Sequence, residues 1–241
     1  MAKRTQMPKS AGIPQGKAKI AAKKKQTGSP IVLWGIIGAV ALVLVVVIVL
    51  QVQAMNRPIT TSGAISEGTG WGPVDAPVKI VEYSDYGCTY CRQFALNQGR
   101  QLREEYEKTG KVRFEYKSFI IEGASTRDAA NAAYCAADQK RFWDYSEVLF
   151  NKSGTGQSQS IFSKAALKDY GVQIGLDAAQ FGRCVDSGQF IPEVQNQNAE
   201  GARLGVQATP SFFINGRKIE GAAPYSEFKT MIDAALAAAG S

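Results

Sequence analysis

The sequence predicts an α/β domain that is interrupted by a helical block and preceded by a single transmembrane helix. Three observations lead to this prediction. Strand-like and helix-like segments follow one another in the order β-α-β, a helical block, and β-β-α. A Cys-x-x-Cys motif stands at the first junction between a strand and a helix. Residues 31–50 contain no charged residue and follow a lysine-rich N-terminus.

The positive charge of the chain is concentrated at its N-terminus. The whole sequence holds 28 basic and 21 acidic residues, which gives a net charge of +7. Eight of the basic residues and none of the acidic ones fall within residues 1–30, so the rest of the chain has 20 basic against 21 acidic residues. A folded domain with this balance lacks the positive surface that nucleic acids require. We therefore expect no nucleic-acid partner.

Residues 31–53 are long and apolar enough to cross a bilayer as one helix. Lysines on the N-terminal side place the basic tail of residues 1–30 in the cytoplasm. Residues 54–72, rich in glycine, serine and threonine, are predicted to be a flexible linker. The alternative is a signal peptide cleaved near residues 52–54. Because signal peptides have apolar cores of only ~7–15 residues, a retained anchor is favoured.

The chain has four cysteines, Cys88, Cys91, Cys135 and Cys184, and no histidine. All four follow the predicted anchor, so they would lie outside the cytoplasm, where disulfides persist. The missing histidine excludes Ser-His and Cys-His catalysis, histidine zinc ligation and histidine-ligated haem. Cys135 and Cys184 are expected to form a structural disulfide, and the alternative is a pair of buried free thiols.

The segments of the predicted domain, residues 73–241, can be assigned in order. Residues 78–83 are a short β-rich run, and apolar residues then recur at helical spacing over 91–106. Residues 111–119 alternate between apolar and polar as a second strand. Two strands joined by a helix form a βαβ unit, so we expect these strands to be parallel.

The rest of the domain is predicted to be a helical subdomain followed by a hairpin and a helix. The helical block covers about 120–200, which is too long for a loop. Trp143 and its aromatic neighbours are expected in the core between this block and the sheet. Strand-like residues flank Asn215-Gly216, which is a strong hairpin signal. An apolar stripe over 225–236 predicts the final helix.

Two thiols separated by two residues at the start of a helix can close and reopen a small disulfide. The helix N-terminus favours negative charge, so the first sulfur can ionise near neutral pH. Cys88, just before the helix, should be the nucleophile that forms a mixed disulfide, and Cys91, one turn later, should be the buried resolving thiol. The alternatives are a passive structural disulfide and a zinc site, although Cys135 and Cys184 have no zinc-knuckle spacing.

Four motifs carry a resemblance to a known family. They are Ala76-Pro77-Val78, Glu82-Tyr83-Ser84-Asp85-Tyr86-Gly87-Cys88, Cys135-Ala136-Ala137 followed by Phe142-Trp143-Asp144-Tyr145, and Gly205-Val206-Gln207-Ala208-Thr209-Pro210-Ser211-Phe212-Phe213-Ile214-Asn215-Gly216. With the element order, they make residues 73–241 resemble the DsbA-like thiol–disulfide oxidoreductases of the thioredoxin superfamily. The resemblance implies a thioredoxin fold with an inserted helical subdomain.

The resemblance also implies roles for residues around the cysteines. Thr209-Pro210 matches a loop that ends in a cis-proline beside the active-site disulfide, where a client strand can pair with the backbone. Glu82 matches an acidic residue that could move the Cys91 proton, and the alternative is a solvent-facing position on the sheet edge. Thr89-Tyr90 replaces the Pro-His of the best-known members, so we predict a milder oxidant.

The sequence therefore predicts an extracytoplasmic thiol–disulfide oxidoreductase of a bacterial cell, held in the cytoplasmic membrane by one helix. It would donate the Cys88–Cys91 disulfide to exported proteins with free thiols, without a metal or an organic cofactor. The resemblance implies reoxidation by a quinone-linked membrane protein. The alternatives are a reductase or isomerase of the same fold, a thiol-based metal-binding module, and a purely structural tethered domain.

Overall fold

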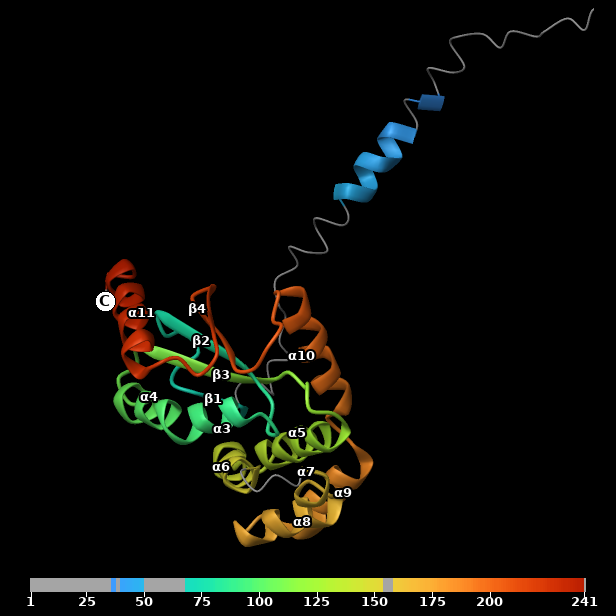
Figure 1. The fold of residues 1–241 in the computed structure, drawn as a ribbon, viewed down its shortest axis with the longest axis vertical. Helices are drawn as coiled ribbons and strands as arrows, with labels where there is room; N and C mark the ends of the chain where they lie inside the picture. Colours follow the sequence, from blue (N-terminus) through green and yellow to red (C-terminus); the bar gives the residue numbers. More distant parts are fainter. Residues whose placement is uncertain (1–35, 38–39, 50–67, 154–157, 241) are drawn as a thin grey trace, which may run out of the picture. The chain divides into compact units, whose positions relative to one another are not determined.

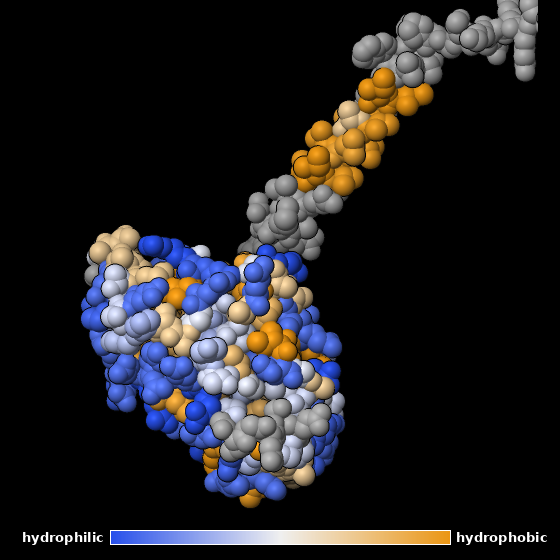
Figure 2. All heavy atoms as spheres, in the orientation of Figure 1, coloured by the Kyte–Doolittle hydropathy of each residue, from blue (hydrophilic) through white to orange (hydrophobic). Residues whose placement is uncertain are grey.

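The computed structural model describes residues 36–37, 40–49, 68–153 and 158–240, and the chain divides into two units, residues 1–57 and 58–241. Residues 40–49 are helical, and their side chains are apolar and exposed (Figure 2). Within the described ranges, no helix has both the length and the apolar character needed to span a membrane. The predicted tail, about half of the predicted anchor and most of the predicted linker lie outside the described residues.

A five-stranded mixed sheet forms the centre of the second unit (Figure 1). The strand order is β1-β3-β2-β4-β5. Strands β2 and β3 are parallel, as predicted, and the other neighbouring pairs are antiparallel. Both residues of the β4–β5 turn, Asn215 and Gly216, have a positive φ, which is what a tight hairpin turn requires. The strands are β1 (Gly70–Trp71), β2 (Val78–Ser84), β3 (Val112–Ser118), β4 (Ser211–Ile214) and β5 (Arg217–Glu220).

The end of the predicted linker is wrong, because β1 belongs to the sheet. Trp71 is only 5% exposed and stacks on Phe114 with ring centroids 5.2 Å apart. A Cβ atom at Gly70 would lie 2.8 Å from the Phe114 carbonyl oxygen, so only glycine lets the two strands approach this closely. The glycines that suggest flexibility in the sequence therefore permit strand pairing, and the folded domain begins before residue 73.

Three helices, α3 (Thr89–Leu96), α4 (Gln98–Tyr106) and α11 (Tyr225–Ala238), share one apolar core with the sheet. The single helix predicted over 91–106 is two helices. Asn97 interrupts them with φ −122° and ψ −86°, and its side-chain amide donates to the Gln93 carbonyl at 2.8 Å. This local hydrogen bond competes with the helical pattern and ends α3.

The helical subdomain runs from α5 to α10, close to the predicted range. Its helices are α5 (Ala124–Ala137), α6 (Phe142–Ser153), α7 (Ser158–Ile161), α8 (Lys164–Gln173), α9 (Ala178–Ser187) and α10 (Ile191–Arg203). In Figure 1, α7, α8 and α9 lie farthest from the sheet. Trp143 packs against both cores, with its ring 6.0 Å from Phe114 and 5.1 Å from Phe142. The predicted aromatic contact between the two parts is thus confirmed.

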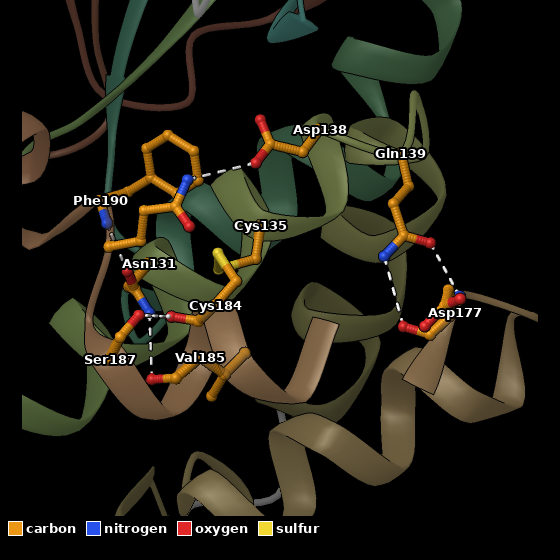
Figure 3. The surroundings of a disulfide bond; sticks show 10 residues. Asn131, Cys135, Asp138, Gln139, Asp177, Cys184, Val185, Ser187 and Phe190 are labelled. Carbon is orange, nitrogen blue, oxygen red and sulfur yellow. Dashed lines mark hydrogen bonds between the residues drawn. A yellow bond between two sulfur atoms is a disulfide. The ribbon is translucent and has the colours of Figure 1, made fainter. Parts of the chain in front are cut away.

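A disulfide between Cys135 and Cys184 joins α5 to α9, which is the pairing expected from the sequence (Figure 3). Asn131, one turn before Cys135, accepts a hydrogen bond from the Phe190 amide at 2.8 Å. Its own amide donates to the Val185 carbonyl at 3.5 Å. The bond and the polar contacts around it therefore fix the two helices against each other.

Candidate active site

The two cysteines of the Cys-x-x-Cys motif sit at the start of α3, directly after the end of β2. Cys88 is the N-cap residue of the helix, and its sulfur accepts a hydrogen bond from the Cys91 amide at 3.4 Å. Both cysteines are free thiols. Cys88 is 6% exposed and Cys91 is fully buried. Cys88 is therefore the more accessible sulfur, although it is less exposed than the sequence suggests.

The environment of Cys88 stabilises a thiolate. A hydrogen bond from the Cys91 thiol is the largest of the effects that lower the Cys88 pKa, from 9.0 to about 6. Burial opposes it, while the Thr209 side chain and the amides of Cys91 and Tyr90 lower it further. The Cys91 pKa is raised well above 9.0, first by burial and then by the neighbouring Cys88. One sulfur of the pair thus ionises near neutral pH and the other stays protonated.

The loop before β4 closes over Cys88. The Thr209–Pro210 peptide bond is cis, as the resemblance implies. The Cys88 thiol donates to the Thr209 carbonyl oxygen at 3.2 Å. The Thr209 hydroxyl is buried, and the described residues offer it no hydrogen-bond partner at standard distance. The loop therefore presents the Thr209 backbone carbonyl to the sulfur.

Glu82 lies on the central strand β2 and is 3% exposed, so the edge position considered from the sequence is wrong. Burial raises its pKa to about 8, the Ser84 hydroxyl lowers it, and the charge of Cys88 raises it. Its Oε1 atom has no hydrogen-bond partner among the described residues. Glu82 is therefore a buried acid that can hold or release a proton near neutral pH.

A cavity of about 80 Å³ adjoins Glu82, between α3, α4 and α6. Trp143, whose indole N–H has no partner among the described residues, and Ser146 also line it. The exposed ion pair of Arg100 and Glu147, 2.6 Å apart, lies among the remaining lining residues. Most of the lining residues are apolar. The cavity therefore brings Glu82 and an exposed ion pair to the border of one small, mainly apolar space.

A family model described as Thioredoxin matches residues 66–234. The chain belongs to this thioredoxin family. Disulfide bond formation protein D of Bacillus subtilis is 27% identical over 168 residues, which cover 68% of this chain and 75% of that protein. The structure of oxidised BdbD from Bacillus subtilis matches with a TM-score of 0.64 and 27% identity, covering 70% of this chain and 94% of that chain. Wolbachia pipientis alpha-DsbA1, at 22% identity and a TM-score of 0.64, covers 71% of this chain and 92% of its own and shares the fold.

Thr89 and Tyr90, the two residues between the cysteines of this thioredoxin domain, were predicted to tune the Cys88 thiol. Tyr90 is 63% exposed, and its effect on the Cys88 pKa comes through its backbone amide. Thr89 is the first residue of α3 and is exposed. At Tyr90, the effect on the Cys88 pKa therefore comes from the backbone amide and not from the side chain. The zinc alternative is disfavoured, because Cys135 and Cys184 are bonded to each other.

Asp85 lies within the motif that runs from Glu82 to Cys88, which assigns it no role, yet it is fully buried beside the active-site turn. Its carboxylate accepts hydrogen bonds from four groups, which belong to the turn before Cys88 and to the start of the helical subdomain. These are the amides of Gly87 at 2.8 Å, Ile121 at 2.8 Å and Glu122 at 2.9 Å, and the Thr126 hydroxyl at 3.1 Å. Neither its place in the motif nor its position three residues before Cys88 indicates these hydrogen bonds.

Proposed function

We propose that this chain is an extracytoplasmic thiol–disulfide oxidoreductase that donates the Cys88–Cys91 disulfide to exported proteins with free thiols. One observation carries the proposal: an ionisable Cys88 is paired with a buried, protonated Cys91 at a helix start beside a cis-proline loop. The enzyme class, thiol–disulfide oxidoreductase, agrees with family membership and with a relative named for disulfide bond formation. The direction, location and clients are the proposed part.

The geometry accounts for each step of the exchange. A client thiolate attacks the Cys88 sulfur of the disulfide, and Cys91 leaves and takes up a proton because burial disfavours its charge. A second client thiolate then attacks the client sulfur of the mixed disulfide. Cys88 leaves as a thiolate, which its lowered pKa makes a good leaving group. Two electrons pass from the client to the cysteine pair, and the client gains a disulfide.

Glu82 is the proposed proton donor to Cys91. Both groups lie near Tyr116, whose pKa is raised first by burial and then by neighbouring charges that include Glu82 and Cys91. Because the pKa of Glu82 is about 8, the carboxyl is mostly protonated at neutral pH and can give its proton to a newly formed thiolate.

The proposed location rests on the sequence and on chemistry. Residues 31–50 carry no charge and follow a basic tail, which favours an anchor with the N-terminus inside the cytoplasm. The Cys135–Cys184 bond suits an oxidising compartment. In such a compartment a reduced Cys88–Cys91 pair needs an oxidant, and we propose the quinone-linked membrane protein that the resemblance implies.

A paired activity assay tests the function and its direction. The purified protein should oxidise a reduced, unfolded model protein and lose this activity in Cys88→Ser. If only insulin reduction depends on Cys88, the protein is a reductase or isomerase; if neither activity does, the enzyme assignment fails. Cys91→Ala should trap exported proteins on Cys88 in cells. Labelling of intact cells with a thiol reagent that does not cross the membrane tests the location.

A further inference from the structure

A second cavity lies on the face of the sheet opposite to α3, α4 and α11. Side chains of successive strand residues point to opposite faces. Ile80 and its neighbours in β3 and β4 pack in the core shared with those helices, so Val81, Glu115 and Phe213 point the other way. In the register of the sheet Val81 pairs with both Glu115 and Phe213, and all three line a cavity of about 310 Å³. This volume is typical of a binding pocket.

Two buried polar atoms at this pocket have no hydrogen-bond partner among the described residues. They are the Tyr83 hydroxyl and the Glu115 Oε2 atom, and both residues line the pocket. Burial, and then the Glu200 carboxylate, which forms no hydrogen bond of standard geometry with the hydroxyl, raise the pKa of Tyr83 and keep it protonated. The hydroxyl can therefore donate to a carbonyl oxygen, while the carboxylate can accept from an N–H. Because unpaired buried polar groups cost free energy, both favour a ligand that supplies these partners.

The charged side chains that line the pocket are paired with one another. Lys79 contacts Glu115 at 2.9 Å, and Lys117 contacts Glu200 at 2.6 Å. These two cations and two anions add no net charge to the pocket. Apolar side chains, among them Leu204, supply most of the remaining lining. Since burying a charge without a partner is unfavourable, the pocket favours an uncharged and mainly apolar ligand.

The pocket adjoins the loop that closes over Cys88. Tyr83, at one end of the pocket, pairs with Ser211, the residue that follows the cis-proline. Thr209 is only five positions after Leu204, so their Cα atoms are at most about 18 Å apart. The Thr209 carbonyl oxygen in turn contacts the Cys88 sulfur. An extended polypeptide joined to Cys88 can therefore reach the pocket with a residue about five positions from its own cysteine.

We propose that this pocket is a second contact site for client polypeptides, and that it binds an apolar side chain about five residues from the cysteine that is joined to Cys88. A client backbone matches the unpaired atoms, because its peptide groups carry carbonyl oxygens and N–H groups. Unfolded clients expose the apolar side chains that folded proteins bury. The inference rests on the proposed thiol–disulfide exchange and specifies which client sequences react fastest.

Photocrosslinking of a trapped peptide locates the contact. In Cys91→Ala, the Cys88 thiolate displaces an aromatic thiol from an activated cysteine peptide and stays joined to the peptide, because the resolving thiol is missing. The peptide carries one photoreactive phenylalanine analogue about five residues before or after its cysteine. We expect mass spectrometry to place the crosslink on Val81, Leu204 or Phe213. Crosslinks found only on other surfaces overturn the proposal.

A rate comparison tests whether the contact selects clients. Two unstructured dithiol peptides, with leucine or serine at the crosslinked position, should be oxidised by the natural protein at rates about tenfold apart. This ratio corresponds to about 1.4 kcal/mol, which partial burial of a leucine side chain supplies. Leu204→Ser should reduce the ratio to within about twofold. Val172→Ser is the matched control, because Val172 is also an exposed apolar residue but lies on α8, outside the pocket.

The proposal is refuted if Leu204→Ser keeps the full ratio, or if Val172→Ser lowers it equally. If Leu204→Ser does not fold, the position of the crosslink decides alone. If the natural protein oxidises neither peptide and Cys88 forms no mixed disulfide, the proposed function itself fails. Oxidation of both peptides at equal rates would instead leave the exchange reaction intact and refute only the second contact site.

Discussion

The acidity of Cys88 is the property that the structure predicts most sharply. In the reduced protein its pKa is about 6, and the Cys91 thiol hydrogen bond is the largest cause. A hydrogen bond to a charged group contributes about 1.5–3 kcal/mol, which corresponds to about one to two pKa units. Cys91→Ala should therefore raise the Cys88 pKa to about 7–8. The thiolate fraction at pH 7 would fall from about 90% to about 10–50%.

The assay is the rate of iodoacetamide alkylation of Cys88 against pH, read by mass spectrometry. Cys91→Ser is the matched control, because its hydroxyl can still donate a hydrogen bond and should preserve most of the shift. A midpoint that stays near 6 in Cys91→Ala would show that the Cys91 thiol is not the main cause. A midpoint near 9 in the natural protein would refute the whole account of the site.

The same shift links pH to the stability of the reduced form. Because the folded pKa lies below the ordinary value of 9.0, the stabilisation is fully present above about pH 9 and is lost as the pH falls through about 6. At pH 7 it favours the dithiol over the disulfide by at most about 1.4 kcal/mol, since solvent near the surface screens the charge. This corresponds to a disulfide more oxidising by up to about 30 mV.

Three further predictions concern other residues of the fold. Glu82→Gln should raise the free energy of unfolding by about 3 kcal/mol at pH 7. The reason is that the folded protein raises the pKa of the Glu82 carboxyl from 4.5 to about 8, which costs stability above pH 4.5. Urea unfolding at pH 4 should show no gain. Replacing Cys135 and Cys184 with alanine should lower the free energy of unfolding by about 4 kcal/mol while the alkylation midpoint of Cys88 stays at about 6. Tyr90→Phe should also leave that midpoint unchanged, because Tyr90 acts through its amide; a shift of one unit would contradict this.

Local sequence patterns predicted the parts of the fold that depend on neighbouring residues. The alternation of β3 and the turn chemistry of Asn215-Gly216 identify their elements without tertiary information. Local sequence patterns failed at one glycine and one asparagine, because tertiary contacts determine the conformation of these residues. From the sequence, Gly70 looks like part of a linker, and only the structure shows that the Phe114 backbone approaches it closely. Asn97 likewise fits a continuous helix, and only the structure shows that its side chain bonds the Gln93 carbonyl.

The residues of the candidate site also fall into those that the sequence predicts and those that only the fold brings together. The spacing of Cys88 and Cys91 is typical of a redox-active pair, so the motif alone locates them. The motif contains Asp85, but its role as a buried anchor could not be predicted, because a carboxylate after a strand usually belongs to a solvated turn and its connector partners begin 36 positions later. Only the fold brings the Ile121 amide to it and makes it a buried anchor.

The prediction of a milder oxidant can be restated in terms of the Cys88 pKa. The sequence argument depended on the missing histidine between the cysteines, yet the Cys88 pKa is lowered by a thiol, a hydroxyl and two backbone amides. A value of about 6 lies between the ~7 of thioredoxin and the ~3.5 of DsbA. If thiolate stability sets the potential, that potential should fall between about −270 and −120 mV. Equilibration with glutathione measures it, and a value at either limit would mean that forces other than the Cys88 thiolate dominate.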